Sequence, residues 1–99
     1  MKYVDWDPDK NAQLKRERDI SFEEVTALYV EGKVLDIVEH HGPGKYSHQK
    51  MFFVEVRAYV YVVPFVEDEK KIFLKTIFPS RNATKKYLIG HKNHKRKKV

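Results

Sequence analysis

The chain has 99 residues, a formal net charge of +6, a hydrophobic fraction of 41% and no cysteine. This length fits one domain, and the lack of cysteine excludes disulfide staples, thiolate zinc sites and cysteine nucleophiles. No apolar run approaches the length of a membrane span, and the N-terminal residues lack the apolar core of a signal peptide, so we expect a cytoplasmic protein without membrane association.

The N-terminal third predicts a short strand and two helices. Residues 2–6 alternate weakly and predict a strand. Asp7-Pro8 then predicts a helix start, because Asp accepts hydrogen bonds from free backbone amides and Pro is favoured at the first helical position. This helix runs to about residue 18, with Ala12, Leu14 and Ile20 as its apolar contacts. Ser21-Phe22-Glu23-Glu24 has the pattern of a capping box, which predicts a second helix ending near Gly32.

The middle of the chain is rich in β-forming residues. Residues 34–40 predict a strand, and Gly42-Pro43-Gly44 marks a loop over 41–50. Three further runs predict a meander of strands, with turns at Arg57-Ala58 and at 67–70: residues 51–56, 59–66 and 71–78. The run 59–65 is almost entirely apolar and predicts a central strand. Pro64 inside it predicts a bulge or a locally unpaired position.

The C-terminal segment is strongly basic. Ser80 predicts the cap of a last helix that packs through Ala83, Tyr87 and Leu88 and ends at Gly90. Residues 80–99 contain eight Lys and Arg and no acid, so residues 1–79 carry a net charge of −2. Since a block of like charge repels itself, we expect it to attract a polyanion such as nucleic acid, or an acidic partner. The alternative is a solubilising tail on an unrelated domain.

This element order is typical of the α+β class. We expect two N-terminal helices and a C-terminal helix packed on one face of a mostly antiparallel sheet of four to five strands. The other face of such a sheet stays open to solvent or to a ligand. Residues 1–90 form the single domain in this interpretation, and residues 91–99 form a basic tail.

The strand–turn–helix junction from Lys75 to Tyr87 is the first candidate site. Arg81 lies in the first helical turn, where a cation opposes the helix dipole and is tolerated more readily when an anion binds. Arg81 and Lys85 are four residues apart and share one helix face. The backbone amides of residues 80–83 add phosphate donors. The junction therefore predicts a phosphate-binding site, and a solvated helix face is the alternative.

The loop that follows the second predicted strand is the second candidate. It contains His40, His41 and His48, and histidine titrates near neutrality and serves as a general acid or base. Lys45 and Lys50 would neutralise a phosphate. We predict no metal site, because the chain has no cysteine and no closely spaced carboxylate–histidine motif. The alternative is a polar connection rich in turn residues.

Aromatic side chains on the predicted sheet are the third candidate. Phe52 and Phe53 are consecutive strand residues and face opposite sides, so one of them points away from the core. Exposed aromatics among basic residues stack the bases of single-stranded RNA. The alternative is that they belong to the core or are covered by a partner protein.

Three motifs together resemble the BrnT family of bacterial toxins. They are Trp6-Asp7-Pro8-x-Lys10, Ile20-Ser21-Phe22-Glu23-Glu24 and Pro79-Ser80-Arg81-x-Ala83, and the resemblance covers residues 3–88. It implies a fold similar to RelE-type toxins and a ribonuclease that cleaves RNA and slows growth. It also implies a cognate DNA-binding antitoxin that covers the toxin in a hetero-oligomer.

Under this hypothesis RNA is cleaved without a metal or cofactor by attack of the 2′-hydroxyl. The reaction needs a base, an acid and fixed cations that stabilise the transition state. We assign Arg81 and Lys75 to transition-state stabilisation, His48 (with His40 as second candidate) to acid or base catalysis, and Tyr87 to stacking or acid catalysis. The predicted RNA-binding residues are Lys45, Lys50, Lys85, Lys86, Lys92, Lys95 and Arg96.

The alternative function is a non-catalytic nucleic-acid- or partner-binding module. This class includes an inactive relative of the toxins. The chain has Glu17-Arg18-Asp19 where the family often carries Lys-His-Gly, and this difference favours an inactive relative.

Overall fold

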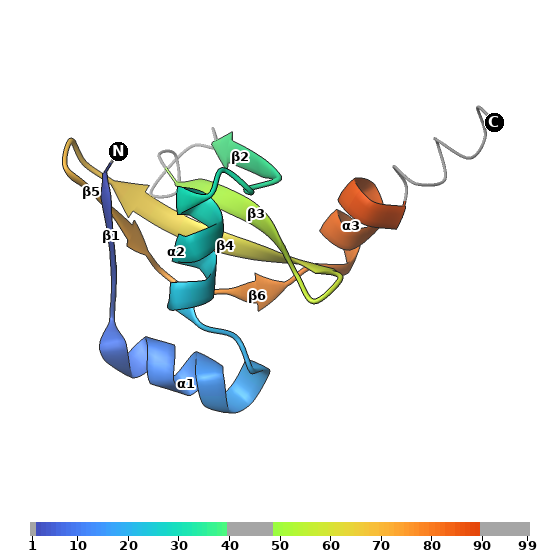
Figure 1. Ribbon diagram of the computed structural model, residues 1–99, viewed down its shortest axis with the longest axis horizontal. Coiled ribbons are helices and arrows are strands. Elements are labelled where there is room, and N and C mark those ends of the chain that lie inside the picture. The colour runs from blue at the N-terminus through green and yellow to red at the C-terminus, as the bar shows by residue number, and fades with distance from the viewer. Residues whose placement is uncertain (1, 40–48, 90–99) are drawn as a thin grey trace.

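The computed structural model describes residues 2–39 and 49–89 (Figure 1). Several predicted features lie outside these ranges and carry no structural description: His40, His41, Lys45, His48, Gly90, Lys92, Lys95, Arg96 and the tail 91–99. None of the helices in the described ranges is long and apolar enough to cross a membrane.

The N-terminal helix signals are confirmed. Strand β1 (Tyr3–Trp6) leads into α1 (Pro8–Arg18), where the Asp7 side chain accepts a hydrogen bond from the Asp9 amide. Helix α2 (Phe22–Val30) begins with the expected capping box, in which Ser21 and Glu24 each accept from the other's amide. Gly32 follows the helix with φ +73°, a left-handed conformation that glycine adopts without steric cost.

A buried asparagine joins the two helices. Asn11 Oδ1 accepts from the Phe22 amide and Asn11 Nδ2 donates to Glu23 Oε1, both at 2.8 Å. Leu14 and Ile20 are buried as predicted, but Ala12 is exposed, so the prediction of an apolar contact at Ala12 is wrong. The physical reason is that Asn11 occupies the inward position, where its amide satisfies the first turn of α2.

The described residues form one mixed sheet of six strands rather than the predicted four to five. The remaining strands are β2 (Asp36–Glu39), β3 (Lys50–Val56), β4 (Tyr59–Glu67), β5 (Lys71–Leu74) and β6 (Phe78–Pro79). The order is β1-β5-β4-β3-β2, and β6 also pairs with β4. Strand β1 runs parallel to β5, whereas the other pairs are antiparallel. The prediction that residues 59–65 form a central strand is confirmed.

A bulge divides the predicted strand 71–78 into β5 and β6. The Lys75 amide donates to Pro64 O at 2.8 Å, and Phe78 pairs with Val62. Two residues therefore lie opposite Val63, where a regular ladder has one. The irregularity predicted at Pro64 lies on the neighbouring strand. An Arg18 guanidinium nitrogen from α1 donates to Ile77 O at 2.6 Å and satisfies this carbonyl of the bulge.

The helices cover opposite faces of the sheet, which corrects the prediction that all three pack on one face. The Tyr29 ring of α2 lies 5.3 Å from Phe52, and Phe52 stacks on Phe65 in the core beneath α1 and α2. On the other side, the Tyr87 ring lies 5.5 Å from Phe53. Because consecutive strand residues face opposite sides, the C-terminal helical segment lies across the sheet from α2. In Figure 1, α3 lies well away from α1.

The C-terminal helical segment is less regular than predicted. Ser80 caps α3 (Arg81–Thr84) as expected, but a π-helix, η2 (Lys85–Ile89), follows at once. Thr84 Oγ1 donates to Ser80 O and accepts from the Val60 amide of β4. Threonine hydroxyls that bond to the preceding turn bend helices, and π-turns are frequent at functional sites. Thr84 thus attaches α3 to β4 where the helical geometry changes.

Candidate nucleic-acid interface

A pocket of about 300 Å³ lies between two strands and the C-terminal helical segment. Val38 of β2 and Phe53 of β3 contribute its apolar wall. The remaining lining residues belong to α3, its cap and η2: Ser80, Asn82, Ala83, Lys86 and Tyr87. We call this site the junction pocket. It brings together two of the predicted site residues, Lys86 and Tyr87, with an aromatic residue of the sheet.

The aromatic wall of the junction pocket consists of Phe53 and Tyr87. Their rings are 5.5 Å apart and tilted by 46°, and both residues are partly exposed. The Lys86 ammonium lies 5.2 Å from the centroid of the Tyr87 ring, within the range of a cation–π interaction. The pocket therefore presents aromatic surface next to a positive charge, which is the combination that single-stranded nucleic acids bind.

The Tyr87 hydroxyl is hydrogen-bonded to Asp36, which is not among the sequence-predicted site residues. Tyr87 Oη donates to Asp36 Oδ2 at 2.7 Å, and Asp36 Oδ1 accepts from the Ile37 amide at 2.8 Å. Burial, then the hydrogen bond and negative charge of Asp36, raise the pKa of Tyr87 to about 12. Asp36 pairs with Phe53 across the β2–β3 ladder and so lies on the pocket side of the sheet. Residue 36 carries no sequence signal for this role, because its partner is 51 residues away.

This hydrogen bond bears on the two roles assigned to Tyr87. An acid must give its proton to the leaving oxygen at the working pH. Tyr87 holds its proton strongly and shares it with Asp36. The ring remains partly exposed beside Phe53, so the geometry favours stacking over acid catalysis for Tyr87.

The phosphate site predicted at the start of the last helix is only partly present. Arg81 and Lys85 are exposed, and within the described ranges neither forms an ion pair with a carboxylate. However, the Ser80 amide donates to Val60 O and the Ala83 amide donates to Ser80 Oγ. Two of the four amides expected to bind phosphate are therefore occupied, and the prediction is wrong for them. The cationic side chains remain as candidates.

Lys75 lies outside the junction pocket. It lies opposite Pro64, directly before the bulge, with its ammonium 6.0 Å from the centroid of the Phe73 ring. Phe73 pairs with Val66 of β4. Alternate residues of a strand share a face, so Val66 lies on the same face as Pro64 and Val62. Val62 pairs with Phe53, so Lys75 is on the same sheet face as the pocket but above another strand. The structure thus does not bring Lys75 into the pocket that contains Tyr87.

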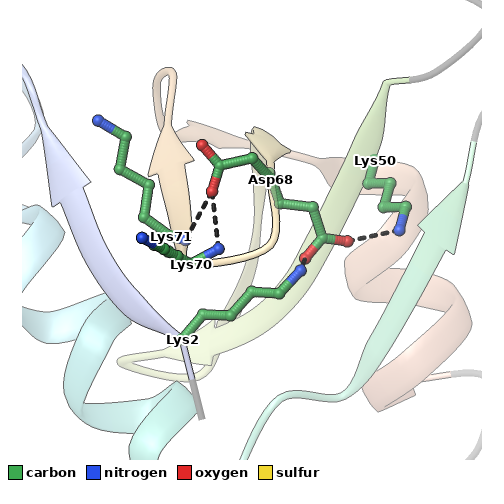
Figure 2. Close-up of polar contacts among 6 residues, drawn as sticks. Lys2, Lys50, Asp68, Lys70 and Lys71 are labelled. Atoms are coloured by element: carbon green, nitrogen blue, oxygen red, sulfur yellow. Dashed lines mark hydrogen bonds and ion pairs between the residues drawn. The ribbon is translucent and has the colours of Figure 1, made fainter.

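Lys50, a predicted RNA-binding residue, takes part in a salt bridge (Figure 2). Lys50 Nζ and Lys2 Nζ contact the two carboxylate oxygens of Glu67 at 2.5 and 2.7 Å. These two hydrogen bonds lower the pKa of Glu67, and the bond to Glu67 raises the pKa of Lys50. Lys50 pairs with Phe65 on the face covered by α1 and α2. It therefore lies across the sheet from the junction pocket.

Two further pockets lie at the turn between β4 and β5. Each is lined by two acidic residues and one lysine: Glu67, Asp68 and Lys71 in one, and Asp68, Glu69 and Lys70 in the other. Asp68 Oδ1 accepts from the amides of Lys70 and Lys71 and so stabilises the turn (Figure 2). Carboxylates disfavour a polyanion, so these pockets are weaker candidates for nucleic acid. Across residues 2–39 and 49–89, no group of three or more His, Asp or Glu side chains is placed to hold a metal ion.

Comparisons with protein-family models, with curated proteins and with solved structures found no match to this chain. The resemblance to BrnT toxins therefore rests on the sequence motifs alone. The chemistry of the junction pocket indicates which ligands this chain can bind.

Proposed function

We propose that this protein binds single-stranded RNA at the junction pocket and cleaves it without a metal ion, as the resemblance to BrnT toxins implies. One observation carries the binding part: Phe53 and Tyr87 form an aromatic wall directly beside the Lys86 ammonium. Stacking of a base on an aromatic side chain contributes about 1–3 kcal/mol per base. The same site therefore supplies a surface for bases and a charge for the backbone.

The surrounding charges favour a polyanionic ligand. Arg81 and Lys85 belong to the same short helical segment as Lys86, and all three are exposed. Within the described ranges none of them is neutralised by a carboxylate, whereas Lys50 and Lys2 are paired with Glu67. Phosphate contacts from such residues release counterions, so affinity should fall linearly with salt on logarithmic axes.

The catalytic part of the proposal keeps the assigned roles. Arg81 and Lys75 stabilise the charged transition state, and His48 acts as acid or base. Tyr87 contributes its ring. The proposal also includes a cognate DNA-binding antitoxin as partner and action in the cytoplasm. The α+β class supports the likeness to RelE-type toxins, although the third helix is placed differently from the predicted arrangement.

The second candidate function is a non-catalytic RNA-binding module. Two observations favour it: the Tyr87 hydroxyl donates its hydrogen bond to Asp36, and Lys75 lies outside the pocket. Tyr87 and Lys75, to which acid catalysis and charge stabilisation were assigned, thus do not line the same pocket. Binding in the junction pocket is common to both candidates.

Incubation of the purified protein with labelled RNA, with and without EDTA, distinguishes the two candidates. We expect wild type to cleave RNA in both conditions and Arg81→Ala to lose about 10²-fold or more in rate, because one fixed charge at a transition state is worth this much. Arg16→Ala is the matched control, since Arg16 is an exposed arginine of α1 without an ion pair in the described chain.

Two other outcomes contradict parts of the proposal. RNA that is bound but stays intact, also when ribosomes are added, would show that the protein is a binding module. Wild type that does not bind RNA at all would contradict both candidates.

A further inference from the structure

We infer that the bound RNA runs from the junction pocket across the same face of the sheet to a second stacking site, formed by the Phe73 ring and the Lys75 ammonium. We call these two residues the second subsite. This inference rests on the proposed function and adds the path and the length of the RNA that the protein binds.

Phe73 and Phe53 lie on the same face of the sheet. Phe73 pairs with Val66 and Phe53 pairs with Val62, and these two partners are four residues apart on β4. Alternate residues of a strand share a face, so both rings point away from the core beneath α1 and α2. Phe78 also pairs with Val62 and is 37% exposed, so it adds a third ring to this face.

The Phe73 end of this face is exposed. The contact of Tyr87 with Phe53 places the C-terminal helical segment over the other end. In Figure 1, α3 lies at the opposite end of the sheet from the turn between β4 and β5. Val66, the partner of Phe73, is 46% exposed, and Phe73 itself is partly exposed. This end therefore offers an apolar and aromatic surface of the kind on which a base stacks.

The second subsite has the same chemistry as the junction pocket. Lys75 Nζ lies 6.0 Å from the centroid of the Phe73 ring, and Lys86 Nζ lies 5.2 Å from the centroid of the Tyr87 ring. Lys75 and Lys86 are both exposed, and within the described ranges neither pairs with a carboxylate. Each site thus combines a ring for a base with an ammonium for a phosphate.

The acidic residues near Phe73 are engaged by other groups. Asp5, which pairs with Phe73 across the β1–β5 ladder, lies 3.7 Å from the Lys71 ammonium. Glu67 accepts from two lysine ammonium groups, and Asp68 accepts from two amides of the turn (Figure 2). Lys75 lies on the side of Phe73 away from this turn. It therefore presents its charge towards the junction pocket.

The register gives the separation of the two sites. Neighbouring strands are about 4.8 Å apart and each residue advances about 3.4 Å, so Phe73 on β5 and Phe53 on β3 lie about 17 Å apart. Stacked nucleotides advance about 3.4 Å each, so about five of them span this separation, or fewer when the strand is extended. Lys75 lies opposite Pro64, midway along β4 between Val66 and Val62. Its ammonium is thus placed to contact a phosphate between the two stacked bases.

The test uses the full chain and fluorescently labelled oligouridylates of two to eight nucleotides, measured by fluorescence anisotropy at low salt. A dinucleotide reaches one stacking site, whereas a hexamer reaches both. We expect the affinity of wild type to rise by about tenfold or more from the dinucleotide to the hexamer and then to level off. Phe73→Leu should remove this gain and leave the affinity for the dinucleotide nearly unchanged. Phe53→Leu should weaken the binding of every length.

Tyr59→Leu is the matched control for the ring. Tyr59 is partly exposed and pairs with Val56, which places it on the opposite face of the sheet, so this variant should keep the gain with length. Thermal melting of each variant checks that the fold is retained.

The charge of the second subsite is tested by salt titration. Lys75→Ala should reduce the slope of log affinity against log salt by about 1 for the hexamer and leave the slope for the dinucleotide unchanged. Lys70→Ala is the matched control, because Lys70 is an exposed lysine of the acidic turn without an ion pair in the described part of the chain. It should leave both slopes unchanged.

A hexamer affinity of Phe73→Leu equal to that of wild type would overturn the inference and leave binding at the junction pocket intact. An affinity that does not rise beyond the dinucleotide would also overturn it. Self-association of wild type in sedimentation that Phe73→Leu abolishes, at unchanged RNA affinity, would assign this face to a protein contact instead. Absence of binding to any oligomer would contradict the proposed function as well, so the two failures are distinguishable.

Discussion

Tyr87 and Asp36, 51 residues apart in the sequence, are joined by a hydrogen bond of 2.7 Å between Tyr87 Oη and Asp36 Oδ2. It connects η2 with β2, the last strand in the sheet order, at the side of the junction pocket. The contact between Phe53 and Tyr87 depends on the same placement of Tyr87. This hydrogen bond therefore helps to hold the C-terminal segment on the sheet, and it requires the protonated phenol.

The first prediction is a loss of stability at alkaline pH that depends on Tyr87. The pKa of Tyr87 in the folded protein is about 12, above its ordinary value of 10.0. A raised pKa means that the folded state favours the neutral phenol. Its contribution to the free energy of unfolding is therefore complete below pH 10 and is lost as the pH rises towards 12. Denaturant unfolding at several pH values should show a smaller alkaline loss for Tyr87→Phe than for wild type.

Asp36→Asn provides the control for this assignment. The difference between the phenolate absorbance titrations with and without the Tyr87→Phe substitution isolates Tyr87 from the other five tyrosines. In Asp36→Asn, the pKa of Tyr87 obtained in this way should fall towards 10 but remain above it, because burial is the largest cause of the shift. Identical alkaline titrations of wild type and Asp36→Asn would show that the hydrogen bond does not contribute.

The second prediction separates the two lysines Lys86 and Lys50. Lys86 lines the junction pocket, so Lys86→Ala should weaken RNA binding and reduce the slope of log affinity against log salt by about 1. Lys50 is paired with Glu67 on the opposite side of the sheet, so Lys50→Ala should leave this slope unchanged. Equal effects of the two substitutions in a salt titration would show that the RNA path is not confined to the pocket side.

The third prediction concerns Arg18, which donates to Ile77 O in the bulge. Arg18→Ala leaves this carbonyl without its partner and should lower the free energy of unfolding by about 1–2 kcal/mol. Arg16→Ala, two residues away on the exposed side of α1, should change it by less than about 0.5 kcal/mol. Urea unfolding measures both, and equal stabilities would mean that the bulge does not need Arg18.

The fourth prediction concerns the turn between β3 and β4. Arg57 and Ala58 have φ values of 51° and 66°, which residues other than glycine, asparagine and aspartate rarely adopt. Ala58→Gly should therefore raise the free energy of unfolding by about 1 kcal/mol. Ala27→Gly, at an exposed position inside α2, should lower it by about 1 kcal/mol. Thermal melting would contradict this account if both substitutions destabilised the protein.

The features that could be predicted from the sequence depend on close neighbours along the chain. The cap at Asp7, the capping box at Ser21 and the helix end at Gly32 each involve residues within about four positions, so the motif contains all of its partners. The central strand 59–67 was predictable because a strand buried on both faces needs a continuous apolar run.

The remaining features depend on contacts between distant segments. The buried position of Asn11 follows from its hydrogen bonds to the start of α2. The bulge beside Pro64 follows from the register of β4 with β5 and β6, and the side of the sheet covered by the C-terminal helical segment follows from the contact of Tyr87 with Phe53. No local pattern in the sequence contains these contacts. For the site, the sequence alone indicates that basic residues cluster after Ser80. Which of them meets an aromatic wall is set by the fold, because the β2–β3 register places Asp36 and Phe53 on one face and Tyr87 bonds there.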